Sequence, residues 1–421
     1  MLTFAPLWTD LFFYALVIVS GGLAFKARHS PARSAWRRVF SHPIGMSTTI
    51  ILGFFILIAF VDSLHFQDQQ SGQLKSMLDL YLVAPQAHVP KSYTAPFEIH
   101  FHSTALETMT WLGHFLVLFI LSSTIFIALR KWKEKSTWTK SLLCFFQPQE
   151  KESFCWRTAY LTYSLLLLGL VFCFEASAHY HILGTDKVGQ DVFYQTIKSI
   201  RTGLLIGTLT TLVTLPIAIL LGLSAGYFGG WIDDIIQYIY TVLNSIPSIL
   251  LIAASVLVFQ VFIEKYPEWF HSNLARADFR LLGLCFILGL MSWTGLCRLI
   301  RAETLKLRER EYVQAAYLLG VSHFRILIRH ILPNVMHIIL ISVVMDFSSL
   351  VLAEAVLSYV GIGVDPSMQS WGNMINSARL EFAREPIVWW NLTAAFIFML
   401  PLVLAANLFS DVVSYAFDPR Q

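Results

Sequence analysis

Long stretches without a single charged residue are the feature that most limits what this chain can fold into. A run of about 18 or more apolar residues can cross the hydrocarbon core of a membrane as a helix. Asp, Glu, Lys and Arg are all absent from residues 44–61, 111–129, 202–232, 235–263 and 388–410. Further apolar runs occupy residues 11–25, 158–174, 281–297 and 335–360. These nine predicted spans indicate an all-α, polytopic membrane helical bundle.

The composition agrees with a membrane protein. Hydrophobic residues make up 56% of the chain and charged residues 14%, whereas a soluble domain carries roughly a quarter charged residues. The five cysteines include no CxxC pair, so the sequence does not indicate a disulfide framework.

The apolar run 11–25 follows Asp10 and precedes basic residues, the reverse of a signal peptide. We therefore expect 11–25 to be a retained span, although its short length would also suit a helix lying in the membrane interface.

The distribution of positive charge predicts the orientation of the spans. Lys and Arg gather in residues 26–43, 130–157 and 298–333, and cytoplasmic loops of membrane proteins are enriched in these residues. Residues 62–110 and 361–387 carry little positive charge. We expect a multi-pass protein with its N-terminus outside and its C-terminus in the cytoplasm.

Residues 311–333 form a polar stretch with helical character between two predicted spans. Glu311 favours the beginning of a helix, because a carboxylate stabilises the positive end of the helix dipole. Gly320 permits a backbone turn that is closed to other residues, and Pro333 suits the start of the next span because it lacks an amide donor. We expect a short helix, a turn at the glycine and a second helical stretch. Such a segment contributes nothing to membrane insertion, so it indicates a soluble partner; an ordinary amphipathic connector is the plainer alternative.

The pattern Ala315-Ala316, Gly320 and Leu332-Pro333 resembles the cytoplasmic loop of ABC importer permeases. That family's pattern is Glu-Ala-Ala, three residues, Gly, nine residues and Ile-x-Leu-Pro; here Gln314 stands at the Glu position and His330 at the Ile position. In the family this loop is the coupling helix, which docks in a groove of the ATP-binding subunit. The resemblance assigns ATPase coupling to Glu311, Gln314, Ala315, Ala316, Gly320 and Pro333.

Other motifs resemble the C-type permeases of dipeptide, oligopeptide and nickel importers. On the outer side the matching residues are Gly184, Thr185, Asp186, Gly189 and Asp191, with Gln190 where the family usually has Arg. The further matches are residues 226–233, 246–248, 301–303, 354–363, 370–374 and 417–420. This resemblance implies the permease core of a type I ABC importer, with about three extra N-terminal spans.

The resemblance divides the chain into four parts. Residues 1–43 form an extra N-terminal span and a basic cytoplasmic loop, and residues 44–66 hold the first core-like span. Residues 67–180 are an insertion with two additional spans that departs from the family. Residues 181–421 are the permease core with its coupling segment at 311–333. We expect the added hairpin of 111–129 and 158–174 to pack at the periphery.

Three residues in predicted spans are candidates for an intramembrane gate. Asp346 and Glu354 are acidic, and carboxylates are costly inside a membrane unless they have a role. Pro247, like Pro216, is expected inside a span, where proline removes a helical hydrogen bond and can form a hinge. We favour a structural or gating role for the carboxylates, with Glu354 pointing inward; a proton relay in a proton-coupled transporter is the alternative.

The sequence contains no GxxxxGK[ST] phosphate-binding loop, so ATP and Mg are expected on partner subunits and no cofactor on this chain. His100 and His102 would share a face of a strand, and with Glu107 they raise the alternative of an intramembrane metalloenzyme. A zinc site normally needs three or four well-placed ligands, so we expect no metal site.

The sequence therefore predicts a permease subunit of an ATP-driven importer in the bacterial inner membrane, without an ATPase site of its own. Peptides are the expected cargo and a nickel chelate is the alternative, both by resemblance. The partners that the resemblance implies are a second homologous permease, two ATP-binding subunits, an extracytoplasmic substrate-binding protein and membrane lipids, with no nucleic acid.

Overall fold

The structure is a computed structural model that describes most of the chain. The described stretches are residues 2–4, 6–27, 32–68, 74–82, 92–99, 113, 116–117, 119–120, 123–124, 154–177, 180–269, 273–385 and 387–417. Most of the predicted span 111–129 and of the basic loop 130–157 lies outside these stretches, as do His100, His102, Glu107 and residues 418–420.

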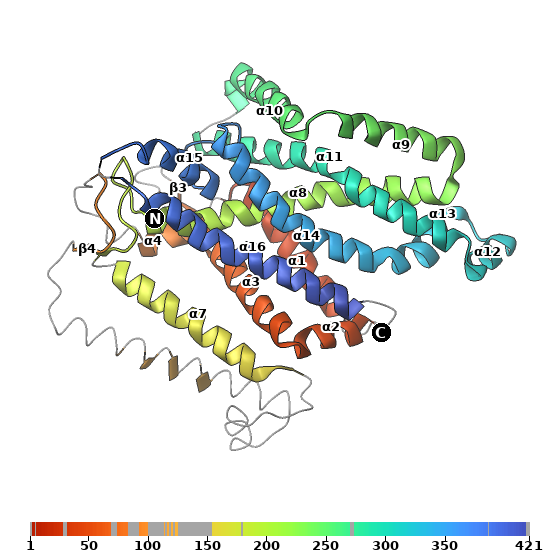
Figure 1. The fold of residues 1–421 in the computed structure, drawn as a ribbon, viewed down its shortest axis with the longest axis horizontal. Helices are drawn as coiled ribbons and strands as arrows, with labels where there is room; N and C mark the ends of the chain where they lie inside the picture. The colour runs from red at the N-terminus through yellow and green to blue at the C-terminus, as the bar shows by residue number, and fades with distance from the viewer. Residues whose placement is uncertain are drawn as a thin grey trace. The chain divides into compact units, whose positions relative to one another are not determined.

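Helices dominate the described residues, which confirms the predicted all-α class (Figure 1). Seven helical segments in the described part of the chain are long and apolar enough to cross a membrane. They are α3 (Pro43–Asp62), α7 (Trp156–Ser177), α8 (Val192–Phe228), α10 (Ser248–Lys265), α11 (Asn273–Arg308), the segment His323–Tyr359 ending in α14 (Leu332–Tyr359), and α16 (Trp390–Phe417). The predicted spans 44–61, 158–174 and 281–297 fall inside these segments. The predicted span 335–360 extends beyond the end of α14 at Tyr359, and 388–410 begins before the start of α16 at Trp390.

Further helices connect or precede these segments. The predicted span 11–25 falls within α1 (Trp8–Ala27). The others are α2 (Ala32–Ser41), α4 (Met77–Leu82), α9 (Gly230–Ser245), a 3₁₀ turn (Pro267–Trp269), α12 (Glu311–Leu318), α13 (His323–Ile326), a π-helical turn (Leu327–Ile331) and α15 (Trp371–Glu381).

The prediction of one span over 235–263 was wrong, because the helix breaks at Pro247. α9 ends at Ser245 and α10 begins at Ser248. Ile246 has an extended backbone, with φ −92° and ψ 132°, as expected for a residue that precedes a proline. Pro247 is therefore not inside a helix but caps the start of α10. Pro216, in contrast, lies inside α8 as predicted.

Two small sheets accompany the helices. β1 (Leu2–Phe4), β2 (His65–Asp68) and β3 (Leu74–Ser76) form an antiparallel sheet in that order. β4 (Glu98–Ile99) pairs antiparallel with β5 (Tyr180–His181), with Glu98 opposite His181 and Ile99 opposite Tyr180. The second pairing joins segment 92–99 to the stretch just before α8.

The chain separates into two compact units. The first holds residues 1–6, 18–201 and 369–416, and the second holds residues 7–17, 202–368 and 417–421. In the first unit α3 packs against both α2 and α7. In the second unit α11 packs against α10 and α14 (Figure 1).

Two glycines on α8 let this helix approach α11 closely in the second unit. A Cβ atom added to Gly222 would lie 2.8 Å from Cβ of Ile300, and one added to Gly226 would lie 2.6 Å from Cβ of Thr304. Glycines four positions apart form a flat strip, a common device for packing helices in membranes. The core of the second unit is therefore a tight helix crossing.

Candidate functional site

The segment 311–333 has the local structure that the sequence predicts. α12 begins at Glu311, after Arg310 in an extended conformation. Its end is a glycine cap: Gly320 has φ 76°, its amide donates to the Tyr317 carbonyl at 3.0 Å, and the Val321 amide donates to the Ala316 carbonyl at 3.1 Å. A second helical stretch follows from His323.

A π-helical turn leads from this second stretch into the next span. Pro333 lies in the first turn of α14, directly after the turn Leu327–Ile331. Proline cannot donate an amide hydrogen bond to the preceding turn, and its ring displaces that turn's carbonyl, so a locally widened helix is the expected response. The side chain of Asn334 donates to the His330 carbonyl at 2.6 Å. Pro333 thus starts the span, as predicted.

Only one side of α12 is fixed to the rest of the second unit. Val313 and Ala316 are buried in a cluster with Ile326 and Ile331. The resemblance assigns coupling to both Ala315 and Ala316, but Ala316 is covered by its own chain, so only the exposed Ala315 of this pair can contact another protein.

The opposite side of the segment exposes large apolar residues, which we name the coupling face. Leu318 and Leu319 are 83% and 82% exposed, and Phe324 is 72% exposed. Tyr317 and Ile328 complete the coupling face. Beside it lies an open hollow of about 540 Å³, lined by Ser322, Phe324, Arg325, Ile328, Arg329 and Pro333. Gln314 and Glu311 are also exposed. An apolar surface of this kind with a basic rim is typical of a protein–protein contact.

A polar anchor joins the coupling segment to the end of α8. The Tyr227 hydroxyl and His323 Nδ1 share a hydrogen bond of 2.8 Å. Arg308 donates from Nη1 to the Tyr227 carbonyl at 3.2 Å, and the Phe228 ring packs edge-on against Tyr227. The sequence did not predict this anchor, because Tyr227, Arg308 and His323 are far apart along the chain.

A second anchor joins α9 to α11. Arg301 donates from Nε to Asp233 Oδ1 at 2.5 Å and from Nη2 to Oδ2 at 2.7 Å, and Gln237 donates to Oδ2 at 3.0 Å. The hydrogen bonds from Arg301 hold the pKa of Asp233 below its usual value, against the opposing effect of burial. The two motifs that contain Asp233 and Arg301 were identified from the sequence, but their pairing was not.

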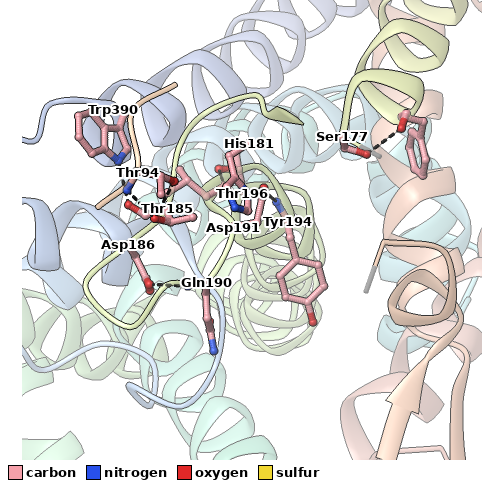
Figure 2. A network of polar contacts seen from close by, with 12 residues as sticks. Thr94, Ser177, His181, Thr185, Asp186, Gln190, Asp191, Tyr194, Thr196 and Trp390 are labelled. Carbon is pink, nitrogen blue, oxygen red and sulfur yellow. Dashed lines mark hydrogen bonds and ion pairs between the residues drawn. The ribbon is translucent and has the colours of Figure 1, made fainter. Parts of the chain in front are cut away.

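On the other unit, the residues predicted as an outer-side motif build the loop before α8 (Figure 2). Asp186 is the centre of the loop: its Oδ1 accepts from the amides of Val188 and Gln190, both at 2.8 Å, and its Oδ2 accepts from Gln195 at 2.7 Å. Gly189 has φ 84°, which explains a glycine at that place.

Asp191 caps the first turn of α8. Its Oδ1 accepts from the Tyr194 amide at 3.0 Å, and its Oδ2 lies 2.7 Å from His181 Nδ1. Gly184 has φ 71°, and a Cβ there would lie 3.0 Å from Trp390 Nε1. The tryptophan donates from Nε1 to the Thr185 carbonyl at 3.0 Å. The five motif residues therefore shape one loop.

Segment 92–99 is hydrogen-bonded to this loop, and Figure 2 shows the contact between Thr94 and Thr185. The Thr94 amide donates to Thr185 Oγ1 at 2.8 Å, and the Thr185 amide donates to the Thr94 carbonyl at 3.2 Å. The Tyr93 amide donates to the Asp186 carbonyl at 3.1 Å. Segment 92–99, predicted to belong to an insertion, thus supports the loop 180–191, a contact that the sequence did not reveal.

Glu354 lies in the second unit and supports the end of α14. It is 1% exposed and accepts from Ser358 Oγ at 2.7 Å. Ser358 Oγ in turn accepts from the Val364 amide at 3.2 Å, and Gly361, with φ 86°, ends the helix. The carboxylate is therefore buried within its own chain, and its predicted gating role stays a prediction. Asp346, half-buried on the same helix, is not part of this chain of bonds.

The motif 370–374 begins α15. Ser370 caps the helix by accepting from the Asn373 amide at 3.0 Å. Trp371, 1% exposed, donates from Nε1 to the Thr196 carbonyl at 3.2 Å, and Met374 is buried beside it. This short helix was not predicted, although the Ser cap was a usable signal.

Within the described stretches, no three His, Cys, Asp or Glu side chains gather as a metal site would require. The residues His100, His102 and Glu107, which raised that alternative, lie outside those stretches.

Comparison with known proteins identifies the family. A family model described as "binding-protein-dependent transport system inner membrane component" matches residues 218–421. The oligopeptide transport system permease protein OppC of Mycobacterium tuberculosis is 33% identical over 239 residues, which cover 57% of this chain and 76% of the relative. The dipeptide transport system permease protein DppC of Lactococcus lactis is 30% identical over 240 residues, 57% of this chain and 64% of the relative. The chain therefore belongs to the family of inner-membrane components of binding-protein-dependent transport systems, as a multi-pass transmembrane permease subunit.

Proposed function

We propose that this permease subunit imports peptides, driven by ATP that separate subunits hydrolyse. The names of its relatives support this cargo, since they are called oligopeptide and dipeptide permeases. Neither of these names favours the alternative of a nickel chelate. Peptide transport is thus the best-supported function.

The segment 311–333 is the contact for the ATP-hydrolysing subunit in this proposal. The observation that carries it is the combination of an exposed coupling face and a firmly held opposite side. Leu318 and Leu319 offer apolar area to a partner, while Val313 and Ala316 pack into the core of the second unit. Movement of the partner against the coupling face is transmitted to α8 through the hydrogen bond between Tyr227 and His323, because the segment is not a loose loop.

The residue roles follow from these positions. Gln314, Ala315 and Glu311 are exposed and contact the partner, whereas Ala316, Gly320 and Pro333 hold the shape of the segment. ATP and Mg²⁺ bind to the partner subunits, in keeping with a sequence that contains no phosphate-binding loop.

The orientation that fits this role has the N-terminus outside and the C-terminus in the cytoplasm of a bacterial cell. Positive charge around 298–333 supports a cytoplasmic coupling segment. The loop 180–191 then faces outward, where an extracytoplasmic binding protein delivers its cargo. The complete importer contains a second homologous permease and two ATP-hydrolysing subunits.

The four-part division of the chain belongs to the same proposal. Residues 181–421 act as the transport core, and residues 44–66 supply its first span. The bonds from segment 92–99 to the loop 180–191 support a bracing role for part of the insertion 67–180. Residues 1–43 add a further helix before the first core span.

Co-purification tests the coupling role. The tagged wild-type chain, expressed with its neighbouring transport subunits, is expected to bring down the ATP-hydrolysing subunits in stoichiometric amounts. Leu318→Glu places a charge on the coupling face and is expected to reduce their recovery at least tenfold. Leu380→Glu is the matched control, because Leu380 is 69% exposed on α15. Full recovery with Leu318→Glu would refute the proposed contact.

A further inference from the structure

Two buried side chains join the end of α15 to the beginning of α16. Glu381 is the last residue of α15, and Asn391 is the second residue of α16. They are 2% and 1% exposed. Asn391 donates from Nδ2 to Glu381 Oε2 at 3.2 Å. The amide nitrogen of Asn391 is therefore bonded to one of the two carboxyl oxygens of Glu381.

The other edge of each group is unsatisfied. Glu381 Oε1 and Asn391 Oδ1 are buried, and neither has a hydrogen-bond partner among the described residues. Both atoms are acceptors as long as the carboxyl group is ionised. Leaving a buried polar atom without a partner is unfavourable, and it is more so when the group is charged. A proton on Glu381 Oε1 would supply a donor, and Asn391 Oδ1 is a buried acceptor that lacks one.

We propose that Glu381 carries a proton on Oε1 and donates it to Asn391 Oδ1, so that acid and amide form a closed pair with two hydrogen bonds. The proton comes from solvent on the side of the membrane where α15 lies. In this pair each group donates once and accepts once. The site therefore binds a proton, and the pair is a latch between α15 and α16.

The charges around the pair favour the neutral acid on balance. Burial raises the pKa of Glu381, the hydrogen bond from Asn391 lowers it, and repulsion by Asp186 raises it. Lys187 and Arg384 act in the lowering direction. The guanidinium of Arg384 lies over the Tyr93 ring, 4.5 Å from its centre. The pKa of Glu381 remains above its ordinary value despite these two cations.

The latch has a definite position in the first unit. Asn391 follows Trp390, which donates to the Thr185 carbonyl in the loop 180–191. Loss of the proton would leave a buried charge beside the Asn391 oxygen and release the end of α15. Because the pKa is raised in the folded protein, the stabilisation is complete below the ordinary carboxyl range and is lost as the pH rises through the raised pKa.

Infrared spectroscopy of the purified full-length chain tests the protonation directly. We expect the carbonyl band of a neutral carboxylic acid in the wild type at a pH above the ordinary carboxyl range. Glu381→Gln should remove this band while preserving the fold, because glutamine can form the same closed pair with Asn391. Glu385→Gln, a change at an exposed neighbour, should leave the band unchanged.

A double variant that exchanges the acid and the amide distinguishes the proposed pair from a general effect of the substitution. Glu381→Gln combined with Asn391→Asp again places one acid opposite one amide, so the band should return. The melting temperature of the wild type should fall as the pH is raised, relative to that of Glu381→Gln at each pH. An identical band in wild type and Glu381→Gln would overturn the proposal, and so would parallel pH profiles of melting.

Discussion

Arg301 donates two hydrogen bonds to Asp233, one from Nε to Oδ1 at 2.5 Å and one from Nη2 to Oδ2 at 2.7 Å. The pair joins the first turn of α9 to α11 across 68 positions of sequence. A planar guanidinium that meets both carboxylate oxygens fixes direction as well as distance. The end of α11 leads into the coupling segment. This pair therefore fixes the helix from which that segment extends.

Replacement of Asp233 by Asn should weaken this connection between α9 and α11. The change keeps the size of the side chain but removes the charge, and hydrogen bonds to charged groups contribute about 1.5–3 kcal/mol each. We expect the free energy of unfolding in detergent to fall by about 2 kcal/mol. Asp234→Asn, at an exposed neighbour, is the control and should have little effect. Equal stability of Asp233→Asn and wild type would show that the pair is not a structural anchor.

The same pair predicts a pH dependence. Because the pKa of Asp233 is lowered in the folded protein, its stabilisation is complete above the ordinary carboxyl pKa. It should be lost as the pH falls through the lowered pKa. Melting curves recorded from neutral to acidic pH should converge for wild type and Asp233→Asn. Curves that stay apart by the same amount at every pH would contradict this.

Tyr227→Phe should loosen the coupling segment without unfolding the chain. The change removes the hydroxyl that bonds to His323 and costs about 1 kcal/mol. We expect the amount of peptide imported per ATP hydrolysed to fall, while ATP hydrolysis continues. Tyr415→Phe is the matched control, since Tyr415 is 62% exposed on α16, outside the coupling segment. The ratio of uptake to hydrolysis in proteoliposomes measures the effect, and an unchanged ratio would remove Tyr227 from the coupling route.

Glu354→Gln and Glu354→Leu should differ. Glutamine keeps an oxygen that can accept from Ser358, so this change is expected to alter uptake less than twofold. Leucine leaves Ser358 without that partner and loosens its bond to the Val364 amide, at a cost of about 1–3 kcal/mol. Uptake should then fall severalfold. Equal damage by both changes would instead favour a role for the charge, as in a proton relay.

Labelling of single cysteines tests the orientation. In a background without other cysteines, Leu318→Cys should react with an impermeant thiol reagent only after the cells are opened. Val188→Cys, at a position 60% exposed in the loop before α8, should react in intact cells. The reverse pattern would invert the orientation of every span between these positions.

The sequence predicted the spans well because a charge inside a membrane is costly and its absence is easy to read. It did not predict where helices end. Hydropathy is continuous across Ile246 and Pro247, so only the backbone restriction before proline could have indicated the break between α9 and α10. The helix α15 was missed because it is short and polar, and a 3.6-residue pattern needs more length to be recognised.

The candidate site shows the same limit. The Gly320 turn and the start of a span at Pro333 could be predicted, since both depend on the backbone of one residue. The pairs Asp233–Arg301 and Glu381–Asn391 could not, because their geometry depends on how separate elements pack. The burial of Ala316 beside the exposed Ala315 was likewise decided by Ile326 and Ile331.

Peptide uptake into proteoliposomes tests the central claim most directly. The complete importer is reconstituted with ATP held constant, the binding protein and a labelled peptide are supplied on the side of the loop 180–191, and the proton gradient is dissipated. We predict that uptake continues at its full rate and stops when ATP is withdrawn or when Leu318→Glu is introduced. Uptake that needs the gradient and proceeds without ATP would contradict the account.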